Sequence, residues 1–430
     1  MDALPRRFPA RLNDRLSVCL DLFYDLMIQL ELEFAERLDA DRLARALRLA
    51  LDAEPILGCR LVEGWLRSHW ERLDEADLGR LLVTESEDEY EAFKVTSLDP
   101  HTGPQLKACL WRAADGDRLL FKVTDIVTDG GGFKEAVAMV SGLYARLADD
   151  PDHRPEPNLQ GSRSAWQVLR RMPWWAVPRS LLDLLRDLWF AVARPTHHGL
   201  PIDDGPRTPL TFLVRELEAD RIARLAAWGR ARDATLNDLL VAGVFRALAA
   251  EGNWDGQAQL RLAMTIDLRR YLPSGRGAAI ANLSAVALAW PCLGTELGAD
   301  FPATLARVAE ITRYRKGRGL GLTESLAVAF VAPLPHAWAR GIFRHVWRQQ
   351  VEQHNHQPAL TNMGPIDPDT VTFGTRPQAA RLLPPPGYPP GFLAGLSGYD
   401  GSLTLSAGVY PTQREIMGRF LDRVLAELPE

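Results

Sequence analysis

The 430-residue sequence predicts a globular α/β protein, and three observations carry this prediction. Apolar residues make up 47% of the chain and charged residues 24%, a balance that suits a protein with a large core and excludes extensive disorder. Segments with strand periodicity alternate with segments of helix periodicity, as in layered α/β folds. At about 100–200 residues per domain, the length corresponds to two or three domains or one large one.

Strands and helices are expected to alternate in the first lobe, residues 1–157. Residues 26–34 contain alternating apolar and polar side chains, as a half-buried strand does. Asp39 precedes a helix with one apolar face and is its expected N-cap. Further along, the patterns predict paired strands at 106–112 and 118–124 and a helix at 133–148.

A polar, proline-rich stretch ends this lobe, and a linker follows at residues 158–206. Within it, the segment 162–195 mixes tryptophans with arginines, a composition typical of interfacial helices. Pro173 and Pro178 break the segment into short pieces. The favoured interpretation is therefore a linker that packs its aromatic face on a lobe, with contact to a membrane surface as the alternative.

The second lobe is expected to span residues 207–430. A continuous apolar face predicts a well-buried helix at 235–251, and Asp400-Gly401 is a turn signal for a hairpin within 393–409. The other predicted elements are strands at 210–214, 260–267 and 283–290, an interrupted helical stretch at 327–350 and a final helix at 414–428.

Composition and missing motifs exclude several classes of protein. The net charge of −5 argues against a nucleic-acid partner. The cysteines are far apart and form no CxxC pair, so buried thiols are expected in place of disulfides or a thiolate zinc site; they are Cys19, Cys59, Cys109 and Cys292. No signal-peptide core or 18-residue apolar window occurs, which predicts a cytoplasmic protein.

The histidines form no convincing catalytic or metal site. His197-His198 precede an Asp-Gly pair, but the spacing is wrong for a motif and the string lies in the linker. His354 and His356 have no nearby carboxylate or cysteine to complete a ligand set. Structural or solvated roles are also expected for His101, His336 and His345, and no metal is predicted.

Six different short strings occur along the chain in a particular order, and one of them, FKVTDIVTDGGG, covers residues 121–132. The others cover residues 38–62, 98–112, 234–247, 266–269 with 281–282, and 360–366. Together they resemble the superfamily of chloramphenicol acetyltransferase, the condensation domains of nonribosomal peptide synthetases, and the wax ester synthase/diacylglycerol acyltransferases. The string at 121–132 falls where that superfamily has its HHxxxDG motif.

The resemblance implies two pseudo-symmetric acetyltransferase-like lobes in a V around a central tunnel. In the family, a thioester donor and an amine or alcohol acceptor enter the tunnel from opposite sides, and the second histidine of the motif orients or deprotonates the acceptor. The motif aspartate, here Asp129, is implied to be structural and to pair with an arginine such as Arg269. Asn282 and Asn362 match asparagine positions near the tunnel, with Ser284 and Thr361 beside them.

The motif departs from the family pattern at both histidines. Asp125 occupies the position of the catalytic histidine and Thr124 the one before it, whereas Asp129 and Gly130 are retained. An ordinary aspartate is a weaker base than histidine by roughly 2.5 pKa units. Burial and the nearby Asp129 would raise the pKa of Asp125, which then acts as a base or as a neutral hydrogen-bond donor. The alternative is a polar residue at a strand end, in a site that has lost its chemistry.

The sequence thus predicts a condensation-like acyltransferase of small-molecule biosynthesis. Asp125 and Asp129 are the predicted catalytic pair, and Thr124, Thr128, Gly130, Gly131, Asn282, Ser284, Thr361 and Asn362 the motif and tunnel residues. An acyl-CoA or a phosphopantetheinyl carrier thioester is the expected donor, with a small-molecule acceptor, an acyl or peptidyl carrier protein as partner, no tightly bound cofactor and a monomeric state. Two alternatives stay open. One is a tunnel enzyme for cyclisation, rearrangement, dehydration or epimerisation, and the other a silent module that binds a carrier or substrate.

Overall fold

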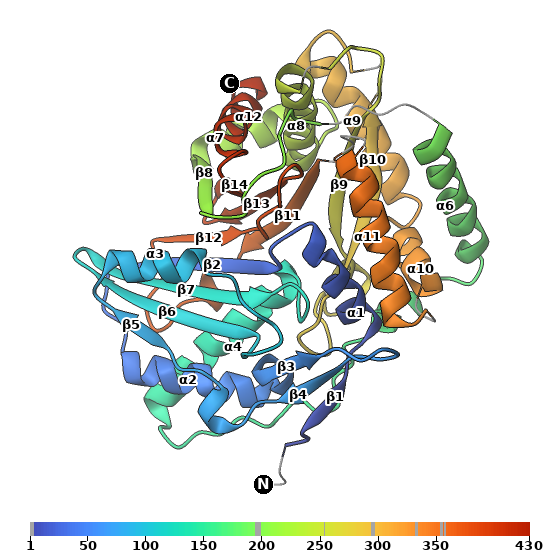
Figure 1. Ribbon diagram of the computed structural model, residues 1–430. Helices are drawn as coiled ribbons and strands as arrows, with labels where there is room; N and C mark the ends of the chain where they lie inside the picture. Colours follow the sequence, from blue (N-terminus) through green and yellow to red (C-terminus); the bar gives the residue numbers. More distant parts are fainter. Residues whose placement is uncertain are drawn as a thin grey trace.

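The computed structural model describes residues 4–193, 199–252, 254–293, 297–331, 334–352, 356 and 358–430. Within these residues the strands form one sheet of five strands, one of six and a small sheet of three (Figure 1). Helices pack around each large sheet, which gives two α/β lobes. The predicted two-lobe α/β class is confirmed.

The sheet of the first lobe has the strand order β12-β2-β7-β6-β5. Alternate residues of β2, such as Leu30 and Leu32, enter the core beneath α2 and α4, whereas Glu31 faces α3 and bonds Tyr90 at 2.5 Å. This alternation is the period-2 pattern that the sequence shows. The bounds are β2 (Met27–Phe34), α2 (Ala40–Ala53), β5 (Leu82–Thr84), α3 (Glu87–Val95), β6 (Leu106–Ala113), β7 (Gly116–Thr124), α4 (Gly130–Asp149) and β12 (Ala379–Leu383).

The sheet of the second lobe has the order β10-β9-β11-β13-β14-β8. Its core is built largely on α8, which buries an almost continuous run of apolar side chains against α9, α12 and the sheet. The bounds are β8 (Thr211–Leu217), α7 (Ala219–Arg230), α8 (Leu236–Glu251), β9 (Leu260–Asp267), β10 (Ser284–Leu293), α9 (Phe301–Lys316), β11 (Ala359–Ile366), β13 (Leu393–Tyr399), β14 (Ser402–Val409) and α12 (Arg414–Glu427).

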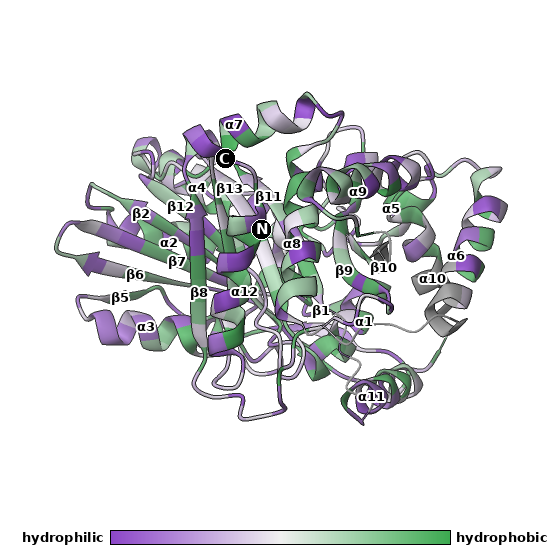
Figure 2. Ribbon diagram, turned by 90° about the horizontal axis from the view of Figure 1, so that it is seen from above, coloured by the Kyte–Doolittle hydropathy of each residue, from purple (hydrophilic) through white to green (hydrophobic). Residues whose placement is uncertain are grey.

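The remaining elements lie beside and between the lobes. The small sheet has the order β1-β4-β3, and α1 follows β1 directly. Figures 1 and 2 show α6 at the outer edge of the molecule, next to α10. The bounds are β1 (Arg7–Pro9), α1 (Leu12–Cys19), β3 (Cys59–Val62), β4 (His69–Arg72), α5 (Trp166–Leu169), α6 (Ala176–Ala193), α10 (Leu322–Val331) and α11 (His336–Glu352).

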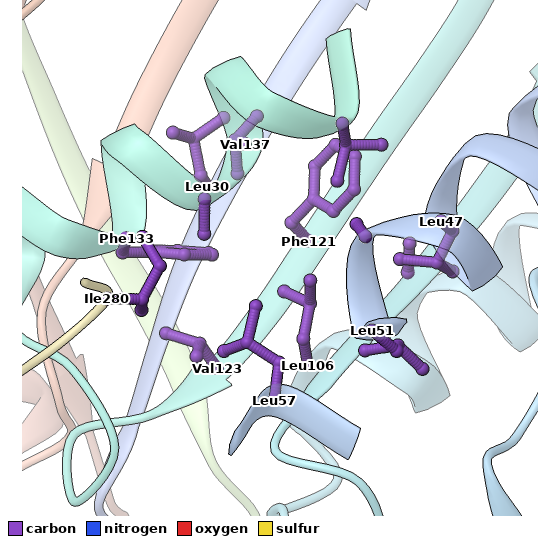
Figure 3. Packing of buried hydrophobic residues seen from close by; sticks show 14 of the residues in the cluster. Leu30, Leu47, Leu51, Leu57, Leu106, Phe121, Val123, Phe133, Val137 and Ile280 are labelled. Carbon is purple, nitrogen blue, oxygen red and sulfur yellow. The ribbon is translucent and has the colours of Figure 1, made fainter. Parts of the chain in front are cut away.

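The two lobes interlock, because parts of the later chain complete the first lobe. β12 pairs antiparallel with β2, and Phe373 packs on the rings of Phe34 and Phe121. Ile280 lies in the same core, near Phe133 (Figure 3). The division of the chain at residues 157 and 207 stays a prediction, and the sheets show that a strand crosses it.

Local sequence signals agree with the structure at most elements. Asp39 caps α2 by accepting from the Arg42 amide at 3.0 Å. Asp400 and Gly401 both have positive φ, at 46° and 84°, as the predicted hairpin turn requires. One boundary was predicted too late: α4 begins at Gly130, not at 133, because the side chain of Asp129 caps it.

Candidate functional site

The loop between β7 and α4, residues 124–130, lies where the two lobes meet. Thr124 ends β7, and Asp129 is the N-cap of α4, with its side chain accepting from the Gly132 amide at 2.9 Å. Between them, Ile126 and Val127 are buried in the core of the first lobe. These two apolar side chains anchor the loop, so the acids on either side of them hold defined positions.

Asp129 is held by the second lobe through an ion pair with Arg269. The Nη1 atom of Arg269 lies 2.7 and 2.9 Å from the two carboxylate oxygens of Asp129. The Leu283 amide donates to the same carboxylate at 2.7 Å. Both side chains are buried, so the pairing of Asp129 with Arg269 that the family resemblance implied is present in the structure.

Arg269 is the centre of a wider cluster of acids. Its backbone amide donates to Asp267 at 2.9 Å, and its Nε lies 3.4 Å from Glu135. Burial opposes the charge of Arg269, but the three acids outweigh it and raise its pKa. Burial also raises the pKa values of Asp267 and Glu135. One guanidinium therefore lies close to three carboxyl groups, and its loss would remove the ion pair of the buried Asp129.

The glycines after Asp129 allow this close approach. A Cβ atom on Gly131 would lie 2.9 Å from Nη1 of Arg269, and one on Gly132 would lie 2.2 Å from the Thr128 hydroxyl. Gly130 has more room, since its nearest contact would be Met363 at 3.2 Å. Gly131 and Gly132 are thus needed for the packing of the ion pair.

Asp125 has a very different environment four residues earlier. Its backbone is fixed, because its amide donates to Leu26 at 2.9 Å and its carbonyl accepts from Asn282 at 2.8 Å. Its carboxyl group receives only a long contact from the Asn282 amide, at 3.5 Å. No arginine or lysine of the described chain forms an ion pair with it.

Burial raises the pKa of Asp125 well above its ordinary range, and the negative charge of Asp129 adds to the effect. Asp125 as a residue is nevertheless only half-buried. A raised pKa favours the protonated carboxyl group, which is able to donate a hydrogen bond.

Tyr24 is close enough to Asp125 for the charge of Asp125 to act on it. Burial raises its pKa to about 12, and the charge of Asp125 contributes to that rise. Its ring packs on Ala263, Ala359 and Leu393 of the second sheet. Tyr24 was not predicted from the sequence, since a single aromatic residue before a strand gives no signal of this placement.

Two threonine hydroxyl groups lie on the same face of the second sheet as Tyr24. Thr265 and Thr361 lie two residues beyond Ala263 and Ala359, so their side chains share the face that Tyr24 covers. Their oxygens are 2.7 Å apart. Thr361 was predicted near the centre, and the structure places it on this face.

Asn282 connects the loop to α1. Its carbonyl accepts from Asn13 at 2.8 Å, and its side-chain oxygen accepts from the Ser284 hydroxyl at 2.7 Å. The Asn282 amide also lies 3.4 Å from the Ser17 hydroxyl. Asn282 and Ser284 therefore lie together beside Asp125.

The other predicted residues lie further from Asp125. Thr124 donates to Gln105 at 2.5 Å inside the first lobe, and Thr128 lies 3.3 Å from the Ala281 carbonyl. Asn362 is exposed and donates to Asn237 at 2.9 Å. Thr124 and Asn362 make these contacts away from the carboxyl group of Asp125.

A second ion pair that the sequence did not indicate holds the middle of the loop. Arg163, from the linker, donates to both oxygens of Asp14 at 2.9 Å. It also donates to the carbonyls of Val127 and Ile280, at 2.8 and 2.9 Å. The linker thus joins α1, the loop and the second lobe. The two partners are 149 positions apart in the sequence, so no local pattern indicates the pair.

A cavity of about 900 Å³ lies on another side of α1. Arg11, Arg15 and Arg67 line it, and no aspartate or glutamate is among its lining residues. Ser68 and His69 also line it, and within the described residues Ser68 Oγ and His69 Nε2 are buried without a hydrogen-bond partner. The cavity is positively charged and has polar atoms available for a ligand.

Among the described histidines, His336 and His101 make structural contacts. His336 is buried and bonds Glu63 at 2.9 Å, and His101 lies 3.4 Å from the same carboxylate. His345 is exposed. His197, His198 and His354 lie outside the described residues, as does the side chain of Cys292, whereas the other three cysteines are buried and free.

Comparison with known proteins is consistent with this geometry. No protein-family profile matches the chain. The uncharacterised protein Rv2305 of Mycobacterium tuberculosis strain H37Rv is 25% identical, over 93% of this chain and 92% of its own length.

Solved structures with high similarity share the whole architecture. The first condensation domain of the calcium-dependent antibiotic synthetase superposes with a TM-score of 0.70 at 18% identity, over 97% of this chain and 95% of that one. Polyketide synthase associated protein 5 from M. tuberculosis has a TM-score of 0.68 at 15% identity, over 98% and 96% of the two chains. An epimerisation domain and a cyclisation domain match as well.

The chain therefore has the fold of the condensation domains, as its sequence motifs indicated.

Proposed function

We propose that this chain is a condensation-like acyltransferase that joins a thioester-activated acyl group to an amine or an alcohol. The observation that carries the proposal is the position of Asp125. It is a half-buried residue whose carboxyl group pairs with no cation of the described chain, where the lobes meet and where the resembled motif has its histidine.

Acyl transfer from a thioester requires little acid–base catalysis from such a group. The acceptor nitrogen or oxygen attacks the thioester carbonyl carbon, the C–S bond then breaks, and the acceptor proton ends on the departing thiol. A protonated Asp125 donates a hydrogen bond to the oxyanion or a proton to the sulfur, and it recovers the proton from the acceptor. Holding the two substrates together supplies much of the rate enhancement.

The arginine-lined cavity supports a donor that carries phosphate groups, such as an acyl-CoA or a phosphopantetheinyl carrier thioester. Arginine binds phosphate with paired, charge-assisted hydrogen bonds. Arg67 is exposed and forms no ion pair within the described residues. With Arg67→Gln, KM for acyl-CoA should rise about tenfold, whereas KM for an acyl-pantetheine without phosphate should not change.

A second candidate function follows from the proximity of Tyr24 to Asp125. Two proton carriers with raised pKa values suit cyclisation or epimerisation of a bound substrate, in which a proton moves but no acyl group changes partner. The solved structures that match this fold include one named as an epimerisation domain and one named as a cyclisation domain. This candidate predicts a product without an acceptor.

The test is a product screen by mass spectrometry. The purified chain would receive acyl-CoA and acyl-carrier thioesters with amines and alcohols, beside Asp125→Ala, Asp125→His and the control Asn362→Ala. Acyl transfer that is lost in Asp125→Ala and kept in the control supports the proposal. Transfer that appears only with Asp125→His contradicts it and favours the second candidate or a binding module.

A further inference from the structure

The helix α6 is amphipathic, and part of its apolar surface faces outward. Ser180 and Asp183 are buried, whereas Leu182 and Leu185 are 67% and 63% exposed. The buried Asp183 accepts from Arg318 at 2.7 and 2.6 Å. A helix on the surface of a globular protein ordinarily buries its apolar stripe and exposes its polar residues. On α6, Leu181 and Leu184 are half-buried, whereas Leu182 and Leu185 add an apolar surface that faces outward.

The exposed apolar side chains form one stripe. Leu182, Leu185 and Trp189 follow one another at intervals of three and four residues, which places them along a single helical face, and Trp175 lies in the turn that precedes the helix. Both tryptophans are about 60% exposed, and Trp174 beside them is 84% exposed. Single exposed apolar residues are ordinary, but a continuous stripe marks a surface that binds something.

The charge around the stripe is positive. Residues 166–193 contain four arginines and two aspartates, and one of those aspartates is Asp183, already paired with Arg318. Arg170, Arg171 and Arg179 are exposed and form no ion pair within the described residues. The partner of this face must therefore combine an apolar part with negative charge.

We propose that α6, together with Trp174 and Trp175, docks on the surface of an anionic lipid bilayer. The helix lies in the plane of the interface, with its leucines and tryptophans among the upper acyl chains and its arginines at the headgroups. Tryptophan is enriched at this depth of a bilayer. Within the described residues no helix is long and apolar enough to cross a membrane, so the contact is peripheral.

A second copy of the chain explains the face less well. A two-fold symmetric interface places the same patch against itself, which would bring the unpaired arginines of the two copies together. Like charges brought together in this way oppose association.

The test is flotation of the full chain with vesicles of phosphatidylcholine, with or without phosphatidylglycerol. The wild type should bind the anionic vesicles, and added salt should weaken the binding. Leu182→Ser/Leu185→Ser/Trp189→Ser should reduce the bound fraction about tenfold. Arg170→Gln/Arg171→Gln/Arg179→Gln should remove the preference for anionic lipid. Circular dichroism would verify that each variant is folded.

The matched control is Trp338→Ser/Ile342→Ser, which removes two apolar side chains of α11 that are 63% and 51% exposed. It should bind vesicles like the wild type. The proposal is overturned if the wild type fails to float, or if the control loses as much binding as the α6 variant. Sedimentation without lipid separates the alternative, since dimers that the α6 variant abolishes would show that a second copy covers the face.

Discussion

The two ends of the loop between β7 and α4 hold their acids in opposite ways. Asp129 receives hydrogen bonds from Arg269 and from two backbone amides, and it joins the lobes. Asp125 has one long contact to an amide and no cation among the described residues. The comparison shows that the second lobe decides which acid is structural and which is available for chemistry, because it supplies an arginine to only one of them.

The largest effect on stability is expected for Arg269, which pairs with Asp129 at one end of the loop. Arg269→Met should destabilise the protein by about 3–5 kcal/mol, because the buried Asp129 would lose the arginine that pairs with it. The free energy of unfolding in urea would measure the loss. Arg269→Met with Asp129→Asn should recover part of it, and a loss below about 1 kcal/mol would show that the ion pair does not hold the lobes together.

A somewhat smaller effect is expected at the middle of the loop. Arg163→Gln should cost about 3 kcal/mol, since Asp14 is buried and the carbonyl of Val127 would lose its donor. Thermal unfolding would report it. Arg170→Gln, an exposed arginine of the same linker, is the matched control and should change stability by less than about 0.5 kcal/mol. Equal effects of the two substitutions would refute the structural role of Arg163.

Substitution of Asp125, at the other end of the loop, should have the opposite effect and stabilise the protein. The pKa of Asp125 is raised on folding, so the folded chain binds the proton more tightly and loses stability as the pH rises from the unfolded-state pKa towards the folded one. Asp125→Asn removes this cost and should stabilise the protein at pH 8 by roughly 1 kcal/mol. Near pH 4 the gain should shrink. Urea midpoints at the two pH values test this, and a variant that is less stable at pH 8 would contradict it.

The smallest effect is expected for Thr265 and Thr361, which lie on the sheet face that Tyr24 covers. Thr361→Val leaves the Thr265 hydroxyl without its partner and should cost about 1 kcal/mol. Thr265→Val with Thr361→Val should cost less than the single substitution, because neither hydroxyl then remains unpaired. A double-mutant cycle in urea would detect the difference, and purely additive costs would show that the two hydroxyls do not interact.

Most of the fold was readable from the sequence because its elements have strong local signals. The alternation in β2, the cap at Asp39 and the turn at Asp400-Gly401 each depend on residues close together in the chain. The pairing of Asp129 with Arg269 came from the order of the motifs and not from periodicity.

The remaining features depend on contacts between distant segments. The crossing of β12 into the first sheet, the ion pair of Asp14 with Arg163 and the placement of Tyr24 give no local pattern. The favoured interpretation of segment 162–195, a linker that packs its aromatic face on a lobe, was wrong, because Trp166, Trp174, Trp175 and Trp189 are exposed. Periodicity shows that a helix has an apolar side but not which way that side points.

The protonation state of Asp125 tests the account most directly. The chain would be labelled with aspartate that carries ¹³C at the side-chain carboxyl, and the signal of Asp125 would be assigned by its absence in Asp125→Asn. We predict a titration midpoint well above that of an ordinary aspartate, about 3.9, so that the group still carries its proton where other aspartates are ionised. A midpoint at or below about 3.9 would contradict the account, since Asp125 would then be an ordinary surface carboxylate.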